Sequence, residues 1–286
     1  MGVGYQDIDR NVIDYDIWFV DDGRLALRGP RTDLNLDDVN CCIGAAQTFG
    51  RFVARPFPVQ ISQILRKPVL NLGFSGAGPE FFLNDSFLMS RLARAGLVVI
   101  QAMSARSVSA GVFRAGGNNG VLEFVEGPRQ GERMLAQEAY STLRAEYGEP
   151  AFRDQIAAVQ ARWLALHRQL INHIAGQKVL LWLSQKKPGD NIDLTTSPVG
   201  VFPHFVSAEM VHEVSALCDC YVDATFEDMQ PQVLVNDLSG MSEASFSAER
   251  FPQRPDRFRR LNTYYATPEM HDHASALLCE ALLKLR

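Results

Sequence analysis

The sequence has no long hydrophobic run. The longest apolar runs, residues 95–100 and 179–183, are much shorter than the roughly 20 residues that a membrane-spanning helix needs. The first residues have neither a basic start nor an apolar stretch, so they do not resemble a signal peptide. Gly2 also lacks the Ser or Thr at residue 6 that a myristoylation site carries. We therefore expect a cytoplasmic protein with no membrane partner.

Cysteine is scarce, with five residues in 286. Cys41 and Cys42 are adjacent, Cys218 and Cys220 are one residue apart, and Cys279 stands alone. An odd number at this spacing fits no disulfide framework and favours a reducing compartment. Metal ligation is the sharper alternative, but this spacing matches no familiar zinc site. The apolar neighbours favour small buried side chains, so we expect no metal site.

Positive charge is not in excess, because 28 Lys and Arg face 33 Asp and Glu, for a formal net charge of −5. This balance gives no bulk attraction to nucleic acid or to an anionic membrane. No internal repeat or low-complexity segment is visible. A hydrophobic fraction of 47% in a chain of this length can bury a large core. We expect one domain over residues 1–286.

What the sequence does contain is an alternation of strand and helix signals. Two apolar arms flank Asp22-Gly23, which predicts a β-hairpin over 15–30. Short apolar runs then predict core strands at 39–43, 68–72, 97–102, 178–183 and 219–222. Apolar residues at helical spacing predict helices at 47–53, 58–65, 79–95 (with Gly96 as C-cap), 132–147, 151–175, 208–217 and 268–285 (with Thr267 as N-cap). Residues 104–131 are expected to form a loop, and residues 224–262 are irregular.

This alternation predicts the α/β class: a doubly wound, mostly parallel sheet in a three-layer sandwich. The hairpin precedes it, and residues 104–175 form an inserted loop and helical region. Ligands of such folds bind beyond the carboxyl ends of the strands. The site should therefore be built from residues 44–50, 73–79, 103–118, 184–190 and 223–230.

The loops after the third and fourth strands carry many hydrogen-bond donors. Ser104, Arg106 and Ser107 follow one strand, and Ser184 and Lys186 follow the other. Arginine forks and backbone amides suit phosphate, sulfate or carboxylate. The predicted ligand is thus an anion or an acidic glycan. The alternative is that Arg106 pairs with a structural carboxylate and that the lysines form a solvated turn.

Other motifs are less specific. Residues 115–120 are rich in Gly and Asn but lack the spacing of a nucleotide phosphate loop. Tyr264 and Tyr265 can stack on a sugar, although such pairs are as often packing elements. The remaining histidines form no ligand spacing: His167, His173, His204 and His212. The sequence names no cofactor and leaves the oligomeric state open.

Three segments together resemble the SGNH (GDSL-type) hydrolases. They are IGAAQTFG at 43–50, PVLNLGFSGAGP at 68–79 and YATPEMH at 265–271. In that family a strand ends in Gly-Asp-Ser, a second strand leads into a Gly-rich motif, and a catalytic His precedes the closing helix. The chain is more closely similar to a bacterial family that carries the same GAAQTFG segment and supplies no activity. The resemblance covers about half the chain, and residues 105–175 have no counterpart in it.

The resemblance implies an SGNH-like fold, but the residues at its catalytic positions cannot do its chemistry. The second motif keeps its glycine, as Gly73 or Gly76. On this alignment Ala46 replaces the nucleophilic Ser, Ala45 its Asp, Ala105 the oxyanion Asn, Tyr265 the base His and Asn262 the orienting Asp. Losing a whole triad leaves only the residual catalysis of binding and orientation. We therefore predict no ordinary serine-esterase activity.

Two routes around this loss remain. The closing segment can be aligned so that His271 or His273 becomes the base, and at most one of them can face the cleft because they are two apart on a helix. Another hydroxyl or thiol can replace the nucleophile, and the nearby groups are Thr48, Ser75, Ser104, Ser107, Cys41 and Cys42. A nucleophile needs an oriented base beside it, and the sequence reveals none.

The leading interpretation is an SGNH-like protein without the hydrolase triad, which binds or modifies an anionic or carbohydrate ligand. As an enzyme it is a group transferase in surface-polysaccharide metabolism, with His271 as the candidate base. The candidate ligand-binding residues are Gln47, Thr48, Gly73, Ser75, Gly76, Ser104, Arg106, Ser107, Ser184, Lys186 and Tyr265. The alternative is a non-catalytic pseudo-hydrolase, acting as a ligand-binding protein or as a scaffold with an apolar patch on the 15–30 hairpin.

Overall fold

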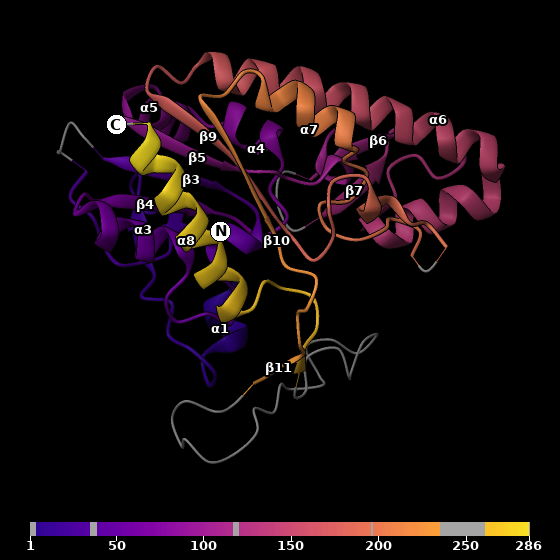
Figure 1. Cartoon of the computed structure of the whole chain (residues 1–286). Coiled ribbons are helices and arrows are strands. Elements are labelled where there is room, and N and C mark those ends of the chain that lie inside the picture. Colours follow the sequence, from indigo (N-terminus) through magenta and orange to yellow (C-terminus); the bar gives the residue numbers. More distant parts are fainter. Residues whose placement is uncertain (1–3, 35–38, 117–119, 196, 235–260, 286) are drawn as a thin grey trace.

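A five-stranded parallel sheet forms the centre of the computed structural model, which describes residues 4–34, 39–116, 120–195, 197–234 and 261–285 (Figure 1). The strand order is β10-β9-β5-β3-β4, and every neighbouring pair is parallel. The strands are β3 (Asn40–Gly44), β4 (Val69–Gly73), β5 (Leu97–Gln101), β9 (Gln177–Ser184) and β10 (Cys220–Thr225). Numbered along the chain, this order is 2-1-3-4-5, the flavodoxin-like doubly wound arrangement.

The short apolar runs become strands because both faces of the sheet are buried. All five residues of β3, of β4 and of β5 are buried. Alternate side chains then enter separate cores, with Ile43 and Leu72 on one face and Cys42 and Val99 on the other. All five core strands are where the sequence predicts them, to within one to three residues at each end.

Helices cover both faces of the sheet (Figure 1). One core includes residues of α3 (Phe57–Leu65) and α8 (Pro268–Lys284), such as Phe57 and Leu278. The other includes residues of α4 (Pro79–Leu83), α5 (Ser86–Arg94), α6 (Ala136–Asn172) and α7 (Ala208–Ser215). The predicted doubly wound α/β sandwich, with a parallel sheet between two layers of helices, is confirmed.

The segment expected to be a loop, 104–131, contains a short 3-10 helix, η1 (Ala105–Ser107), and two strands, β6 (Phe113–Ala115) and β7 (Val121–Phe124). A third strand, β8 (Arg133–Leu135), pairs with β7 and replaces the start of the helix predicted at 132–147. The paired residues Phe113 and Phe124 are buried against each other, and Phe113 also packs against Tyr140 of α6. The loop prediction was wrong because strands of three or four residues, separated by Gly-rich turns, show too little alternation to be read.

Several helix boundaries also differ from the prediction. The helix predicted at 79–95 is two helices, because the Asp85 side chain accepts a hydrogen bond from the Leu88 amide and starts α5. That helix ends at an extended Ala95, so Gly96 is not its C-cap. The two helices predicted at 132–147 and 151–175 are the two arms of α6, which breaks at Gly148 (φ 85°). The helix predicted at 47–53 is only α2 (Ala46–Phe49), which ends at a left-handed Gly50.

The remaining elements flank the sandwich. The predicted hairpin is confirmed as β1 (Trp18–Val20) and β2 (Leu25–Leu27), and α1 (Gly4–Asp9) precedes it. Outside the sheet lie η2 (Asp190–Ile192) and the pair β11 (Gln232–Val233) and β12 (Leu261–Asn262). Thr267 is the N-cap of α8, as predicted. Residues 235–260 of the segment predicted to be irregular lie outside the described residues. No described helix is both long enough and apolar enough to cross a membrane.

Candidate functional site

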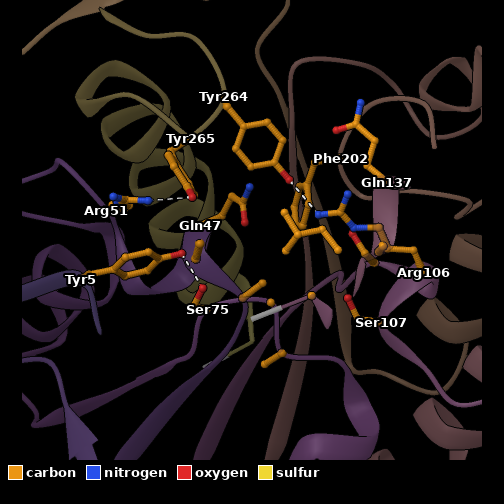
Figure 2. Close-up of a pocket in the computed structure, with 18 of the residues that line it drawn as sticks. Tyr5, Gln47, Arg51, Ser75, Arg106, Ser107, Gln137, Phe202, Tyr264 and Tyr265 are labelled. Carbon is orange, nitrogen blue, oxygen red and sulfur yellow. Dashed lines mark hydrogen bonds between the residues drawn. The ribbon is translucent and has the colours of Figure 1, made fainter. Parts of the chain in front are cut away.

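A pocket of about 300 Å³ opens at the carboxyl ends of the central strands (Figure 2). The chain leaves β3 toward β4 on one side and returns to β5 on the other, so the strand order reverses between β3 and β5. Ala45 and Ala46 follow β3, Ser75 and Gly76 follow β4, and Ser104 follows β5, and all of them line the pocket. This is the place where doubly wound folds bind ligands.

The turn after β3 is fixed by buried hydrogen bonds and by close backbone packing. Gln101 accepts a hydrogen bond from the Ala45 amide (3.0 Å), and the Thr48 hydroxyl lies 3.4 Å from both Gln101 Oε1 and the Ile43 carbonyl. A Cβ atom at Gly73 would lie 2.1 Å from the Phe49 amide nitrogen. Thr48 and Gly73 were predicted to bind ligand, but neither lines the pocket, because one is held in the turn and the other lets β4 approach α2.

One side of the pocket, here called the Arg51 wall, consists of Tyr5, Arg51, Ser75 and Tyr265 with Asp9 behind them. Arg51 Nε and Nη2 each donate to the Asp9 carboxylate at 2.8 Å, and Nη1 donates to Tyr265 Oη at 2.9 Å (Figure 2). Tyr5 Oη donates to Ser75 Oγ at 2.7 Å. Arg51 is 3% exposed and Asp9 is fully buried. The charge on this wall is therefore neutralised inside the protein.

The electrostatics of the Arg51 wall keep the arginine ionised and its tyrosine neighbour neutral. Burial lowers the pKa of Arg51, but Tyr265 and Asp9 more than compensate and raise it above its ordinary value. Burial raises the pKa of Tyr5 well above its ordinary value. The guanidinium also lies over the Tyr5 ring, 4.3 Å from its centroid. The Arg51 wall therefore contains a buried ion pair whose guanidinium donates hydrogen bonds to Asp9 and Tyr265.

The opposite side, here called the Arg106 wall, consists of Ser104, Arg106 and Tyr264 with His204 behind them. Arg106 Nη2 donates to Tyr264 Oη at 3.2 Å (Figure 2). Its Nε is buried and has no hydrogen-bond partner among the described residues. Within the same described ranges, no carboxylate lies within 4.0 Å of Arg106, so the predicted alternative of a structural ion pair is not observed there. Half-buried Arg106 thus brings an unneutralised positive charge to the pocket.

Ser104 on this wall is paired with a histidine from a distant part of the chain. Ser104 Oγ lies 2.8 Å from His204 Nδ1, and the His204 amide donates to the same oxygen at 3.1 Å. Ser104 is 4% exposed and His204 is 2% exposed. His204 was not among the predicted site residues, because it lies in the long segment between β9 and α7, beyond the 184–190 stretch predicted to reach the site. Its position after the carboxyl end of a core strand was the only available signal.

Most of the predicted ligand-binding residues do meet at this pocket. Seven of them line it: Gln47, Ser75, Gly76, Ser104, Arg106, Ser107 and Tyr265. Ser184 instead lines a smaller adjoining pocket of about 190 Å³, and its hydroxyl donates to the Phe202 carbonyl at 2.6 Å. Lys186 lines neither pocket, since its side chain is exposed while its carbonyl accepts a hydrogen bond from Trp182.

The predicted base, His271, belongs to the core. It is fully buried, its Nδ1 accepts a hydrogen bond from the Phe57 amide at 3.1 Å, and its ring stacks on Phe57. Burial, aided by the positive charge of Arg28, lowers the pKa of His271 to about 3. The catalytic assignment is therefore corrected: His271 does not line the pocket, and a neutral imidazole in the core cannot reach a ligand. His273 packs on Phe226 and also lies outside the pocket lining.

The thiols offer no reactive group to the pocket. Cys41 and Cys42 are buried within β3, and burial raises the pKa of Cys41 to about 12. A thiol with so high a pKa is not a nucleophile at neutral pH. Within the described part of the chain, no group of three or more His, Cys, Asp or Glu residues is placed to hold a metal ion.

A comparison with known protein families shows which family the chain belongs to. A family model described as "Domain of unknown function (DUF6473)" matches residues 3–116 and 140–280. The chain belongs to this family. The unmatched internal residues 117–139 include β7, β8 and the pocket residues Gly120 and Leu135. No curated protein matches the sequence.

The solved structures that match the chain are distant from it. The lipase Lip_vut3 from a goat rumen metagenome gives a TM-score of 0.44 at 10% identity, over 85% of this chain and 97% of the lipase. A carbohydrate esterase family 2 enzyme from Corynascus thermopiles (Myceliophthora fergusii) gives 0.41 at 12% identity, over 90% and 69%. Axe2, an acetylxylan esterase from Geobacillus stearothermophilus, gives 0.38 at 9% identity, over 85% and 93%. At such scores the likeness says nothing about the chemistry of this chain.

Proposed function

We propose that the pocket at the carboxyl ends of the central strands binds an anionic ligand, and that Arg106 binds the anionic group of this ligand. The observation that carries this proposal is the guanidinium of Arg106, which lines the pocket and has no carboxylate partner among the described residues. A half-buried charge without a counter-ion is unfavourable, and a bound carboxylate, phosphate or sulfate supplies one.

The rest of the lining favours a carbohydrate as the body of the ligand. Phe202, Tyr264 and Tyr265 bring aromatic rings, and Gln47 and Gln137 bring amides (Figure 2). Aromatic faces pack against the C–H faces of a sugar, and amides bond its hydroxyl groups. A pocket of about 300 Å³ lies at the lower end of the range for small-molecule sites and fits one or two sugar rings.

Hydrolysis by a nucleophile in the segment at 43–50 is not part of this proposal. Ala45 and Ala46 line the pocket at the turn where the SGNH resemblance places the catalytic Asp and Ser. Their methyl groups have no atom that can attack a carbonyl. We propose that the chain either transfers a group from an activated donor, by positioning and charge stabilisation, or binds its ligand without reaction. On the hairpin, Phe19 (53% exposed) is the single exposed large hydrophobic side chain, which favours the pocket over a scaffold role.

A thermal-unfolding panel tests the proposal. It includes nucleotide sugars, adenosine phosphosulfates, acyl-coenzyme A esters and acidic oligosaccharides, with neutral oligosaccharides as the comparison class. A ligand at a hundred times its dissociation constant stabilises the fold by about 2.7 kcal/mol, which raises Tm by roughly 5–10 °C at this chain length. We expect such a rise with one anionic class and none with the neutral sugars.

Arg106→Ala should abolish this rise, and Arg106→Lys should retain only part of it, because lysine keeps the charge but loses the fork. Arg114→Ala is the matched control, since Arg114 is exposed and does not line the pocket. Its guanidinium lies 3.6 Å from the Glu123 carboxylate. A panel in which no anion changes Tm, or a rise that survives Arg106→Ala, contradicts the proposal.

A further inference from the structure

Ser104 and His204 have the geometry of a nucleophile and its base. They are separated by 100 residues in the sequence, yet Oγ and Nδ1 lie 2.8 Å apart, within the range for proton transfer. Ser104 lines the pocket two residues before Arg106. The sequence offers several substitute nucleophiles but reveals no oriented base beside them, and the fold brings His204 next to Ser104.

Both members of the pair are held in place by contacts from three directions. The Ala105 amide donates to the His204 carbonyl at 3.0 Å, and the His204 amide donates to Ser104 Oγ at 3.1 Å. The imidazole lies edge-on to Phe202 and stacks with Tyr264, with centroids 5.8 and 6.3 Å away. Ser104 Oγ accepts from the amide and keeps its own proton, which it can donate to Nδ1. In the tautomer of His204 that carries its proton on Nε2, Nδ1 is unprotonated and can receive the serine proton.

The other pocket hydroxyls lack this arrangement. Ser75 Oγ accepts a hydrogen bond from a tyrosine whose pKa is raised by burial, and a phenol of that kind is not a base at neutral pH. Ser107 also lines the pocket, but its hydroxyl has no histidine partner among the described residues, and Thr48 is buried outside the pocket lining. Ser104 is therefore the hydroxyl at which nucleophile, base and positive charge come together.

We propose that Ser104 is the nucleophile and His204 the base of an acyl-transfer site, and that its substrates are esters carrying an anionic group that Arg106 binds. The choice of anionic esters rests on the function proposed above. In the SGNH hydrolases the nucleophile belongs to the segment that aligns with residues 43–50. In the site proposed here the nucleophile follows β5 and the base precedes α7.

The reaction proceeds in two balanced steps. Ser104 Oγ attacks the ester carbonyl carbon while its proton passes to His204 Nδ1, and the carbonyl π electrons move to oxygen. When the intermediate collapses, the C–O bond to the leaving alcohol breaks, and that alcohol takes the proton from His204. Water, or an acceptor hydroxyl, then attacks the acyl-serine, gives its proton to His204 and releases Ser104, which recovers that proton.

The test uses the full chain and two probes of different charge. Wild-type protein is treated with a fluorophosphonate, which modifies activated serines, and the labelled peptide is identified by mass spectrometry. Hydrolysis is followed with p-nitrophenyl acetate and with the anionic mono-p-nitrophenyl succinate. We expect label on Ser104 and faster turnover of the succinate. Ser104→Ala should reduce turnover to background, and His204→Ala should lower it by at least about a hundredfold. Ser90→Ala and His212→Ala, at exposed positions outside the pocket lining, should leave it unchanged.

Labelling of the wild-type protein decides the question even if a variant folds poorly, and Ser104→Cys, which keeps a nucleophile, should label with iodoacetamide. A wild-type protein that binds an anionic ligand but neither labels at Ser104 nor turns over either ester overturns the acyl-transfer site and leaves the proposed binding function standing. Label at Ser104 with equal turnover of both esters, unaffected by Arg106→Ala, overturns the anionic substrate class instead.

Discussion

Each of the two walls of the pocket has an arginine, a tyrosine and a serine, and the walls differ in the group that lies behind the arginine. Each has an arginine that donates to a tyrosine hydroxyl, Arg51 to Tyr265 and Arg106 to Tyr264. The two tyrosines are adjacent in the chain, and their rings lie at 89° to each other, so they serve opposite walls. Behind Arg51 lies the Asp9 carboxylate, and no carboxylate among the described residues stands behind Arg106.

This difference separates a structural charge from an available one. A buried arginine paired with a carboxylate contributes to the fold, and losing one partner leaves the other unpaired. An arginine that lines a pocket without a counter-ion contributes little to the fold and can bind an anion. Replacing the arginine by alanine should therefore change the free energy of unfolding by very different amounts on the two walls.

The largest expected effect is on the Arg51 wall. Arg51→Ala leaves Asp9 buried and unpaired, and should lower the free energy of unfolding by about 3–5 kcal/mol. Arg106→Ala should change it by less than about 1 kcal/mol, because no described ion pair is lost. Urea unfolding of both variants measures the difference. Equal destabilisation by the two substitutions would mean that the walls do not differ in the way proposed here.

Acid sensitivity should belong to the core histidines. Burial lowers the pKa of His271 to about 3 and of His167 to about 4, against about 6.5 in an unfolded chain. Between these values the unfolded state binds protons that the folded state does not, so stability present above pH 6.5 is lost as the pH falls. Each histidine contributes about 1.4 kcal/mol per pH unit, or about 2.7 kcal/mol per unit for both.

His271→Asn keeps an acceptor for the Phe57 amide and should remove about half of this slope between pH 6 and pH 4.5. His212→Gln, at an exposed position, should leave the slope as it is. Unfolding free energies measured across this range test the assignment. An unchanged slope in His271→Asn would place the acid-sensitive groups elsewhere.

The smallest effect expected is that of single hydroxyl groups. Tyr265→Phe removes the acceptor of a buried Arg51 N–H and should cost about 1–2 kcal/mol of stability. Tyr264→Phe should cost less, and should instead change the affinity of Arg106 for an anion, because it removes the competing acceptor at Nη2. Thermal unfolding and ligand titration of the two variants separate these outcomes. A larger loss of stability from Tyr264→Phe would reverse the comparison.

Local patterns were enough to predict much of the fold. Both faces of β3, β4 and β5 are buried, so their sequences are almost entirely apolar and stand out from the helices. The strand–helix alternation then predicts the sandwich and the edge where the pocket opens. Patterns failed where segments are short, as in β6, β7 and β8, or where a side chain caps a helix, as Asp85 does for α5.

The site residues were predictable only in part. Arg106 and Ser104 follow a core strand directly, so the parallel-sheet rule places them at the pocket. His271 and His204 are the opposite case, because motif resemblance favoured the first and nothing local favoured the second. Which histidine faces a pocket depends on packing between segments far apart in the chain, and on α8 His271 turns toward Phe57.

The sequence by itself determined the sandwich, the location of its crevice and the absence of a nucleophile at Ala46, since each follows from residue type and strand order. Only the tertiary structure decided that Arg51 has a carboxylate while Arg106 lines the pocket without one, and that Ser104 meets His204. The reason is physical: periodicity records which residues are buried, while ion pairs and hydrogen bonds depend on contacts among residues up to 214 positions apart, as between Arg51 and Tyr265.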